Sequence, residues 1–177
     1  YGLIRDPEFF QWLEQNLDRV LVLEGDALEY AIARSCGIKS QIVSEDETET
    51  GVRALLNFGH TFGHAVETAL GYRHWLHGEA VAAGMIIGAD LSVRMGRIDA
   101  AAKQRIVRMV ERCGLPTGLA PGLSAQGIRE LMGVDKKAKS GRLRLILLDA
   151  IGSASIASDV HEELLLAALN AHVQVAT

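Results

Sequence analysis

The sequence predicts a mainly α-helical domain of about seven helices with one small β-hairpin. Apolar residues recur at helical spacing along most of the chain, and Asp or Ser before these segments and Gly after them are typical helix boundaries. One stretch near the C-terminus instead begins with alternating polar and apolar residues and has the character of a β-strand. We find neither an internal repeat nor a glycine-rich phosphate loop after a predicted strand.

The composition limits the classes of protein to consider. The 177 residues, of which 49% are hydrophobic, suffice for one domain or slightly more with a good core. The 18 Lys and Arg are scattered and the net charge is −4, so we expect no nucleic-acid partner. No apolar run reaches the roughly 20 residues of a membrane span, and no signal peptide is visible. Cys36 and Cys113 lie in helical patterns, which favours a reducing cytoplasm.

Two helices are predicted in the first 45 residues. Asp6 and Pro7 have the residue types of an N-cap and a first helical position, and the following apolar face comprises Phe9, Phe10, Leu13 and Leu17. Asp26 is predicted to cap a second, longer helix, whose apolar face comprises Leu28, Ile32, Cys36, Ile42 and Val43. An acidic linker over residues 44–51 follows.

The remaining elements are predicted from the same signals. A central helix runs from Arg53 to about Leu70, and after a turn His77 begins another long helix that Gly96 ends. Asp99 begins a helix that runs to about Cys113. The last elements are a short helix capped by Ser124, a hairpin over residues 142–158 with its turn around 149–152, and a helix over 161–173.

The central helix is predicted to carry a polar face. Arg53, Asn57, His60 and His64 are spaced 4, 3 and 4 residues apart. At about 100° per residue they fall within about 60° of one another on a helical wheel. The other sides of this helix are apolar or small, which is not typical of a solvated helix. We therefore expect the polar face to line a buried cleft.

Glycine and alanine predict a close helix contact near these side chains. Gly59 and Gly63 each cost a helix about 1 kcal/mol, so their presence indicates that something approaches the backbone closely. The helix that begins at His77 is rich in small residues that permit such packing: Gly78, Ala80, Ala82, Ala83, Gly84 and Gly88.

The imidazoles of His60, His64 and His77 indicate a metal site. A catalytic zinc typically takes three protein ligands and keeps one position open. Two readings remain: His60 and His64 clamp one ion, or His60 and His77 bind it while His64 handles protons. The glutamate that follows the first histidine in helical zinc proteases is absent, so we do not expect a peptidase.

Cationic side chains predict an anionic substrate. Arg53 would be costly to bury without an anion, and carboxylate or phosphate matches its two donor edges. Lys39 is either a solvated helix residue or one directed into the cleft, and the same choice applies to Lys136 and Lys137 in a Gly-flanked loop. The residues by themselves thus predict metal-assisted chemistry on a small, anionic, hydroxylated substrate.

The segments RALLNFGHTFGHAVE (53–67) and WLHGEAVAAGM (75–85) resemble the C-terminal domain of 3-dehydroquinate synthase. The likeness continues through residues 47–51, Asp135-Lys136-Lys137 and the hairpin. It implies a helical domain like that of glycerol and iron-dependent alcohol dehydrogenases. It also implies a cytoplasmic, homodimeric lyase of the shikimate pathway, which leads to chorismate and the aromatic amino acids. That family converts 3-deoxy-D-arabino-heptulosonate 7-phosphate to 3-dehydroquinate and phosphate, with NAD and zinc or cobalt.

The resemblance also implies roles for individual residues. His60 and His77 match the family's two histidine metal ligands, and His64 matches a proton-handling histidine. Glu49 matches a carboxylate assigned as proton acceptor. The positions that match substrate-binding residues are Lys39, Arg53, Asn57 and a lysine of the 135–137 loop, for which we favour Lys137.

The family resemblance also implies that part of the active site is missing. The chain opens at Tyr1 within an apolar phrase and reads as a piece of a longer polypeptide. The family's third metal ligand, a glutamate, and its whole NAD-binding domain correspond to positions before Tyr1. We therefore expect residues 1–177, as a C-terminal helical metal- and substrate-binding domain, to be inactive alone and not to bind NAD.

Three other readings compete with this one. Another sugar-phosphate cyclase would share the histidines but differ in the cations that face its substrate. A metal-dependent polyol dehydrogenase is the second alternative. A non-catalytic helical oligomerisation module is the third, and it would not retain stoichiometric zinc.

Overall fold

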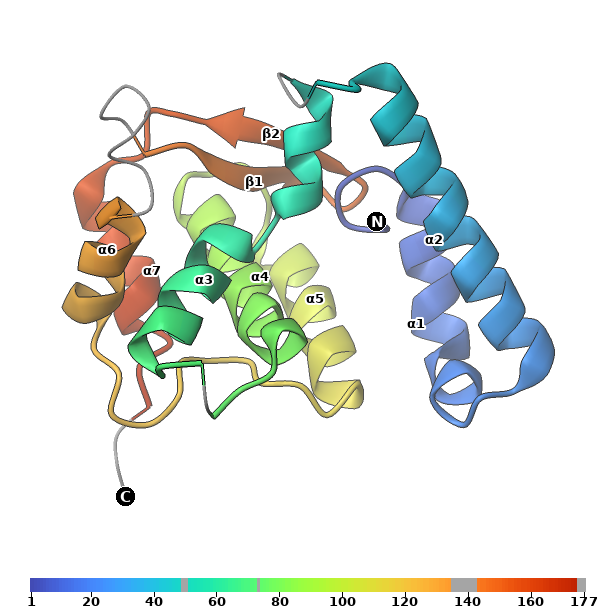
Figure 1. The fold of residues 1–177 in the computed structure, drawn as a ribbon, viewed down its shortest axis with the longest axis horizontal. Helices are drawn as coiled ribbons and strands as arrows, with labels where there is room; N and C mark the ends of the chain where they lie inside the picture. The colour runs from blue at the N-terminus through green and yellow to red at the C-terminus, as the bar shows by residue number, and fades with distance from the viewer. Residues whose placement is uncertain (49–50, 73, 135–142, 175–177) are drawn as a thin grey trace.

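The computed structural model describes residues 1–48, 51–72, 74–134 and 143–174. As Figure 1 shows, these residues form a helical domain with one hairpin, which confirms the predicted fold class. They contain seven α-helices, one 3-10 helix and two strands: α1 (Pro7–Leu21), α2 (Gly25–Glu45), η1 (Val52–Asn57), α3 (His60–Ala69), α4 (His77–Arg94), α5 (Ala100–Arg112), α6 (Ala125–Val134), β1 (Leu145–Ala150), β2 (Ser153–Ala157) and α7 (Glu162–Asn170).

Three predicted helix starts are confirmed by side-chain caps. The Asp6 carboxylate accepts from Phe9 N at 2.9 Å, and the Asp99 carboxylate accepts from Ala102 N at 2.7 Å. Ser124 Oγ accepts from Gly127 N at 3.1 Å, which caps α6. These contacts satisfy amide groups that a helix start leaves without an intrahelical partner.

The prediction for the second helix was wrong in two respects. Asp26 lies in the first turn of α2, after the N-cap residue Glu24, and its carboxylate is 2.8 Å from Arg19 Nη2, with which it forms an ion pair. Ile32, which is 54% exposed, and Cys36 lie on the outer side of the helix. The buried residues of α2 are Ala27, Ile38 and Ile42, of which only Ile42 was predicted. Only the packing against α1 and η1 selects the buried face, because the apolar residues of this helix are spread around its axis.

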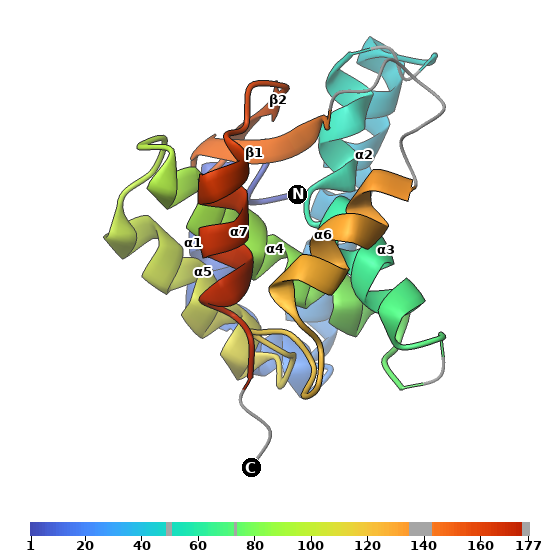
Figure 2. The same cartoon turned by 90° about the vertical axis from the view of Figure 1, so that its left-hand side faces the viewer.

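Helix α4 is the centre of the molecule. Twelve of its residues, from Ala80 to Ser92, are buried. One side of it contributes to a core with α3, α6, α7 and the hairpin, and the other to a core with α1, α2 and α5. Figures 1 and 2 show the α1–α2 pair and the α6–α7 pair on opposite sides of α4. Elements from both halves of the chain are therefore held together by this one helix.

Helices α3 and α4 touch through their glycines, which confirms the predicted close contact. A Cβ atom added to Gly84 would lie 2.1 Å from the carbonyl oxygen of Gly59 and 3.0 Å from the amide nitrogen of Gly63. A Cβ atom added to Gly63 would lie 3.1 Å from Val81 Cα. Any side chain at these positions would push the two backbones apart.

The single central helix that we predicted is wrong, because the chain breaks at Phe58 and Gly59. Phe58 is extended, with φ −56° and ψ 126°, and Gly59 is left-handed, with φ +82°. The break places the Phe58 ring in the core, where it is 2% exposed, and glycine adopts the left-handed conformation at little cost. Arg53 and Asn57 therefore lie on η1 and do not share a helical face with His60.

The hairpin closes one end of the molecule. Strands β1 and β2 pair antiparallel, with Leu145 opposite Ala157 and Leu148 opposite Ala154. The buried Ser92 hydroxyl on α4 accepts from Leu148 N at 3.0 Å, and this hydrogen bond links the hairpin to α4. The predicted hairpin is confirmed, and its turn at residues 151–152 lies within the predicted range. The last helix is shorter than the predicted 161–173.

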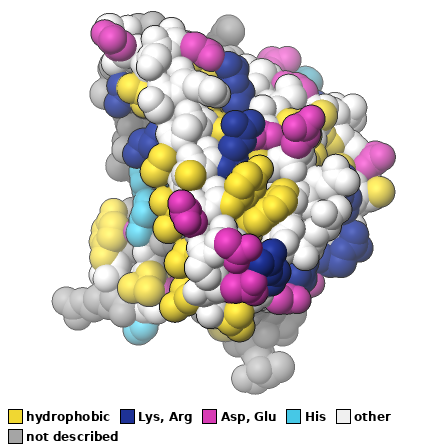
Figure 3. Space-filling model, turned by 90° about the vertical axis from the view of Figure 1, so that its right-hand side faces the viewer, with side chains coloured by type: hydrophobic (Ala, Val, Ile, Leu, Met, Phe, Trp, Pro, Cys, Tyr) yellow, Lys and Arg dark blue, Asp and Glu magenta, His cyan; other side chains and the backbone are white. Residues whose placement is uncertain are grey.

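The surface agrees with the charge pattern of the sequence. Figure 3 shows basic and acidic side chains interspersed on the face over α1 and α2, with apolar side chains among them. Within the described residues, no helix combines the length and the apolar character needed to cross a membrane.

Replacing Gly84 with alanine tests the α3–α4 contact. Because the new methyl group would overlap the Gly59 carbonyl, we expect Gly84→Ala to lower the free energy of unfolding by about 3 kcal/mol or more, at the upper end of overpacking costs. Urea denaturation followed by circular dichroism measures this change.

Gly37→Ala is the matched control. Gly37 lies in the interior of α2, and a Cβ atom there would meet nothing within 4 Å. We expect this variant to be stabilised by up to about 1 kcal/mol through helix propensity. Equal stability of Gly84→Ala and the wild type would show that the two backbones can separate without cost.

Candidate metal and substrate site

Three imidazole rings meet where α3 and α4 begin. His60 is the first residue of α3, His64 lies one turn later, and His77 is the first residue of α4. The ring centroids are 5.4 Å apart for His60 and His77, 5.7 Å for His60 and His64, and 5.8 Å for His64 and His77. The glycine contact between α3 and α4 brings the rings of the two helices together.

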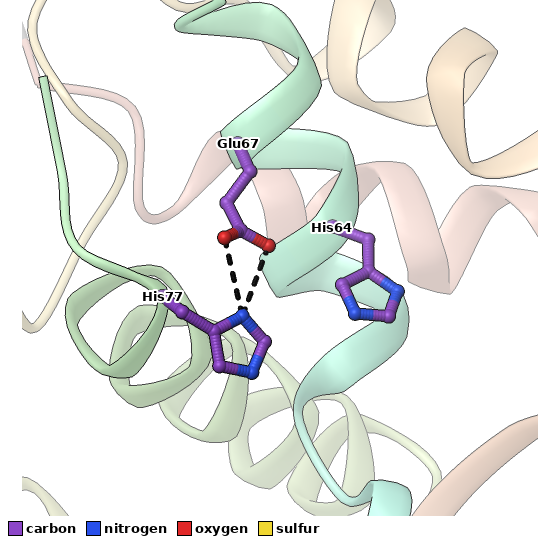
Figure 4. Close-up of side chains that lie close together, drawn as sticks. All are labelled: His64, Glu67 and His77. Atoms are coloured by element: carbon purple, nitrogen blue, oxygen red, sulfur yellow. Dashed lines mark hydrogen bonds and ion pairs between the residues drawn. The ribbon is translucent and has the colours of Figure 1, made fainter. Parts of the chain in front are cut away.

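Glu67 is a member of this cluster that the sequence reasoning missed. Its carboxylate oxygens lie 3.1 and 3.2 Å from Nδ1 of His77, and the residue is only 9% exposed (Figure 4). Its place one helical turn after His64 was a signal that could have found it, because residues three apart share a helix face. The contact to His77, however, depends on how α3 packs on α4.

The environment of His60 favours its neutral form. Its Nδ1 atom lies 3.3 Å from the carbonyl oxygen of Phe58, so this nitrogen is the donor and Nε2 keeps its lone pair. Burial lowers the pKa of His60, and the rings of His77 and His64 lower this pKa further, although the Phe58 carbonyl opposes them. A neutral imidazole with a free Nε2 is the form that binds a metal ion.

The donor atoms of this cluster fit a divalent metal. In both His60 and His77, an oxygen acceptor occupies the side of the ring at Nδ1, which leaves Nε2 for an ion. His64, Glu67 and His77 also offer one donor atom each, all within 4.8 Å of one another. Imidazole nitrogen with carboxylate oxygen is a donor set that zinc and cobalt accept.

Two further predicted site residues line a cavity next to His60. Its volume is about 550 Å³, within the range of small-molecule sites. Its walls come from the N-terminal residues, α1, α2, η1, α4 and α5, and they are mostly apolar. Besides Tyr1, three polar side chains line it: Lys39 from α2, Asn57 from η1 and His60 from α3. The structure thus brings together residues that we predicted to bind substrate and metal, although Lys39 and Asn57 are exposed to solvent.

Arg53 is placed away from this cavity's lining. Its guanidinium donates to the carbonyl oxygen of Glu47 at 2.8 Å, and its backbone amide donates to the Asp46 carboxylate at 3.0 Å. Because the chain breaks between η1 and α3, Arg53 does not share a helix face with His60. The predicted residues Glu49 and Lys137 lie outside the described residues.

A second, smaller pocket is lined by residues of α3 and α6. It has a volume of about 400 Å³ and is lined by His64 and Glu67 together with side chains of α6. Thr68 and Tyr72 also line it, and their hydroxyl oxygens are 3.2 Å apart. His64 therefore belongs to the histidine cluster and also lines a pocket that contains several hydroxyl groups.

Comparison with solved structures identifies the fold. The 2-epi-5-epi-valiolone synthase ValA from Streptomyces hygroscopicus subsp. jinggangensis 5008, solved with NAD+ and Zn2+ bound, is 26% identical over 95% of this chain, with a TM-score of 0.85. A 2-deoxy-scyllo-inosose synthase complexed with carbaglucose-6-phosphate, NAD+ and Co2+ is 24% identical over 84% of this chain, with a TM-score of 0.71, and this likeness shows the fold alone. This chain spans 47% and 43% of the length of those two proteins.

Comparison with family models identifies the sequence family. The model described as 3-dehydroquinate synthase C-terminal matches residues 1–138, which include α1 to α6 and all the histidines of the cluster. The matched residues cover more than half of the chain, and the fold is that of the sugar-phosphate cyclases named above. The chain belongs to the 3-dehydroquinate synthase C-terminal family.

Proposed function

We propose that this chain is the metal- and substrate-binding domain of a 3-dehydroquinate synthase. The enzyme would convert 3-deoxy-D-arabino-heptulosonate 7-phosphate to 3-dehydroquinate and phosphate, a step in the synthesis of chorismate and aromatic amino acids. The observation that carries the proposal is the pair His60 and His77, each with an oxygen acceptor at Nδ1, next to a cavity that Lys39 and Asn57 line. The family match over residues 1–138 supports the choice of this enzyme.

The metal would be held by Nε2 of His60 and of His77. When bound, zinc or cobalt would polarise the substrate oxygens, and NAD would take up and return a hydride. In the family, a third ligand and the NAD-binding residues come from another part of the protein. We assign no NAD contact to the residues of this chain.

The other site residues would hold the substrate and move protons. His64 lies 5.7 Å from His60 between ring centroids, close enough to exchange a proton with a molecule bound at the same metal. Lys39 and Arg53 would hold carboxylate and phosphate groups, and Asn57 would orient hydroxyl groups. On the family resemblance alone, we also propose Glu49 as proton acceptor and Lys137 as a further cation. On the same ground, we propose that the whole protein is a cytoplasmic homodimer.

A related cyclase is the second candidate, because the 26% identical ValA is a 2-epi-5-epi-valiolone synthase. The heptulosonate substrate carries a carboxylate as well as a phosphate, whereas a sugar phosphate without a carboxylate, such as glucose 6-phosphate, carries only the phosphate. Phosphate release from each compound, measured with the whole protein in the presence of NAD and zinc, separates the two. Release from the heptulosonate alone supports the synthase, and release from the sugar phosphate without a carboxylate alone contradicts it.

The two histidines of α3 should respond differently to substitution. His60→Ala removes a proposed ligand, so we expect the whole protein to lose its bound metal. His64→Ala should keep the metal and lower kcat by roughly 10²–10⁴-fold, as expected for a general acid–base group. Elemental analysis after dialysis and steady-state kinetics measure both effects. Equal metal loss in the two variants would instead favour a clamp made by His60 and His64.

Lys39 at the cavity tests the proposed anion site. We expect Lys39→Met to lower kcat/KM for the heptulosonate by roughly 10- to 100-fold, because a charged hydrogen bond contributes about 1.5–3 kcal/mol. Arg108→Met on α5 is the control, since Arg108 is an exposed cation that does not line the cavity. A similar decrease for both variants would indicate a general charge effect and no anion site at Lys39.

A further inference from the structure

We infer that Glu67 is a positioning residue for the metal ligand His77, which it holds in the tautomer that has its lone pair on Nε2. This inference rests on the proposed function, because it assigns His77 to the metal. Its physical basis is a contact between one buried carboxylate and one ring nitrogen.

The contact determines where the proton of His77 lies. Both carboxylate oxygens of Glu67 approach the same atom, Nδ1 of His77, at 3.1 and 3.2 Å. Two anionic oxygens would repel a lone pair on Nδ1, so this nitrogen carries the hydrogen. In the neutral ring the lone pair is then on Nε2, which points away from Glu67 in Figure 4.

The burial of Glu67 favours this contact. The Glu67 side chain is only 10% exposed, whereas that of His77 is 55% exposed. A buried carboxylate is costly unless it is paired, so burial of Glu67 requires a partner such as the His77 ring. The exposed ring of His77 has no comparable packing to hold its orientation. The carboxylate is therefore the group that orients the ring.

The two oxygens of Glu67 are already engaged, which argues against a role as a direct ligand. Although Glu67 lies within 4.8 Å of the donor atoms of His64 and His77, its carboxylate faces the protonated side of the His77 ring. A carboxylate that accepts from the outer nitrogen of a metal-bound histidine raises the basicity of that ligand and fixes its angle. His60 has a similar arrangement, with the Phe58 carbonyl as its acceptor.

The first measurement reads the tautomer without metal or substrate. Nitrogen-15 NMR of the histidine-labelled protein, with His77 assigned from His77→Ala, should show His77 protonated at Nδ1 at a pH where the ring is neutral. Glu67→Ala should move the proton to Nε2, the form that a free imidazole prefers. Glu67→Gln should keep it at Nδ1, because the amide oxygen still accepts a hydrogen bond.

The second measurement is zinc affinity, by competition with a fluorescent chelator. We expect Glu67→Ala to weaken zinc binding roughly 10- to 100-fold and Glu67→Gln to weaken it less. Glu79→Gln is the matched control: Glu79 lies two residues after His77, but its carboxylate accepts from Leu76 N at 2.6 Å and not from the ring. Its zinc affinity should stay within about threefold of the wild type.

The outcomes separate this inference from the proposed function. If His77→Ala binds zinc as tightly as the wild type, the proposed metal site is wrong and the role of Glu67 is wrong with it. If His77→Ala loses zinc while Glu67→Ala keeps both its affinity and its His77 tautomer, only the role of Glu67 is overturned. Loss of all zinc binding in both Glu67→Ala and Glu67→Gln would make Glu67 a direct ligand, which also overturns positioning.

Discussion

The contact between the backbones of α3 and α4 is the constraint on which the site depends. Gly84 meets the Gly59 carbonyl, and Gly63 meets the backbone at Val81, with no room for a side chain at either point. Two helices usually pack 8–10 Å apart, and small residues allow the near end of that range. Because His60 and His64 are on one helix and His77 is on the other, the distance between these helices sets the distance between the rings.

The position of α4 explains how such a contact is kept. This helix is buried along most of its length and belongs to both apolar cores. The buried Asp90 on it pairs with Arg94 and with Lys103 of α5, and Ser92 accepts a hydrogen bond from the hairpin. The N-terminal end of α4, where His77 lies, is by contrast exposed. A rigid helix with one exposed end suits a site in which a ligand must reach solvent or another domain.

Sequence reasoning predicted the fold class, most helix boundaries and the hairpin. It succeeded where a signal is local: Asp6 and Asp99 cap helices through bonds to amides three residues away, and the three histidines stand in two short motifs. It failed for Asp26, for the buried face of α2 and for the continuity of the central helix. At Phe58, burial of one aromatic ring outweighed helix continuation, and this preference is set by the core into which the ring packs.

For the site, the sequence by itself determined the residue types and the family. The imidazoles, the amide and the cations in recognisable motifs were enough to expect a metal and an anionic substrate. Only the tertiary structure decided which of these side chains meet: Lys39 and Asn57 share a cavity with His60, whereas Arg53 turns to the Glu47 carbonyl. It also decided that Glu67 reaches His77, ten residues later on another helix. The reason is physical, since a helix pattern places side chains around one axis but the distance between two axes comes from packing.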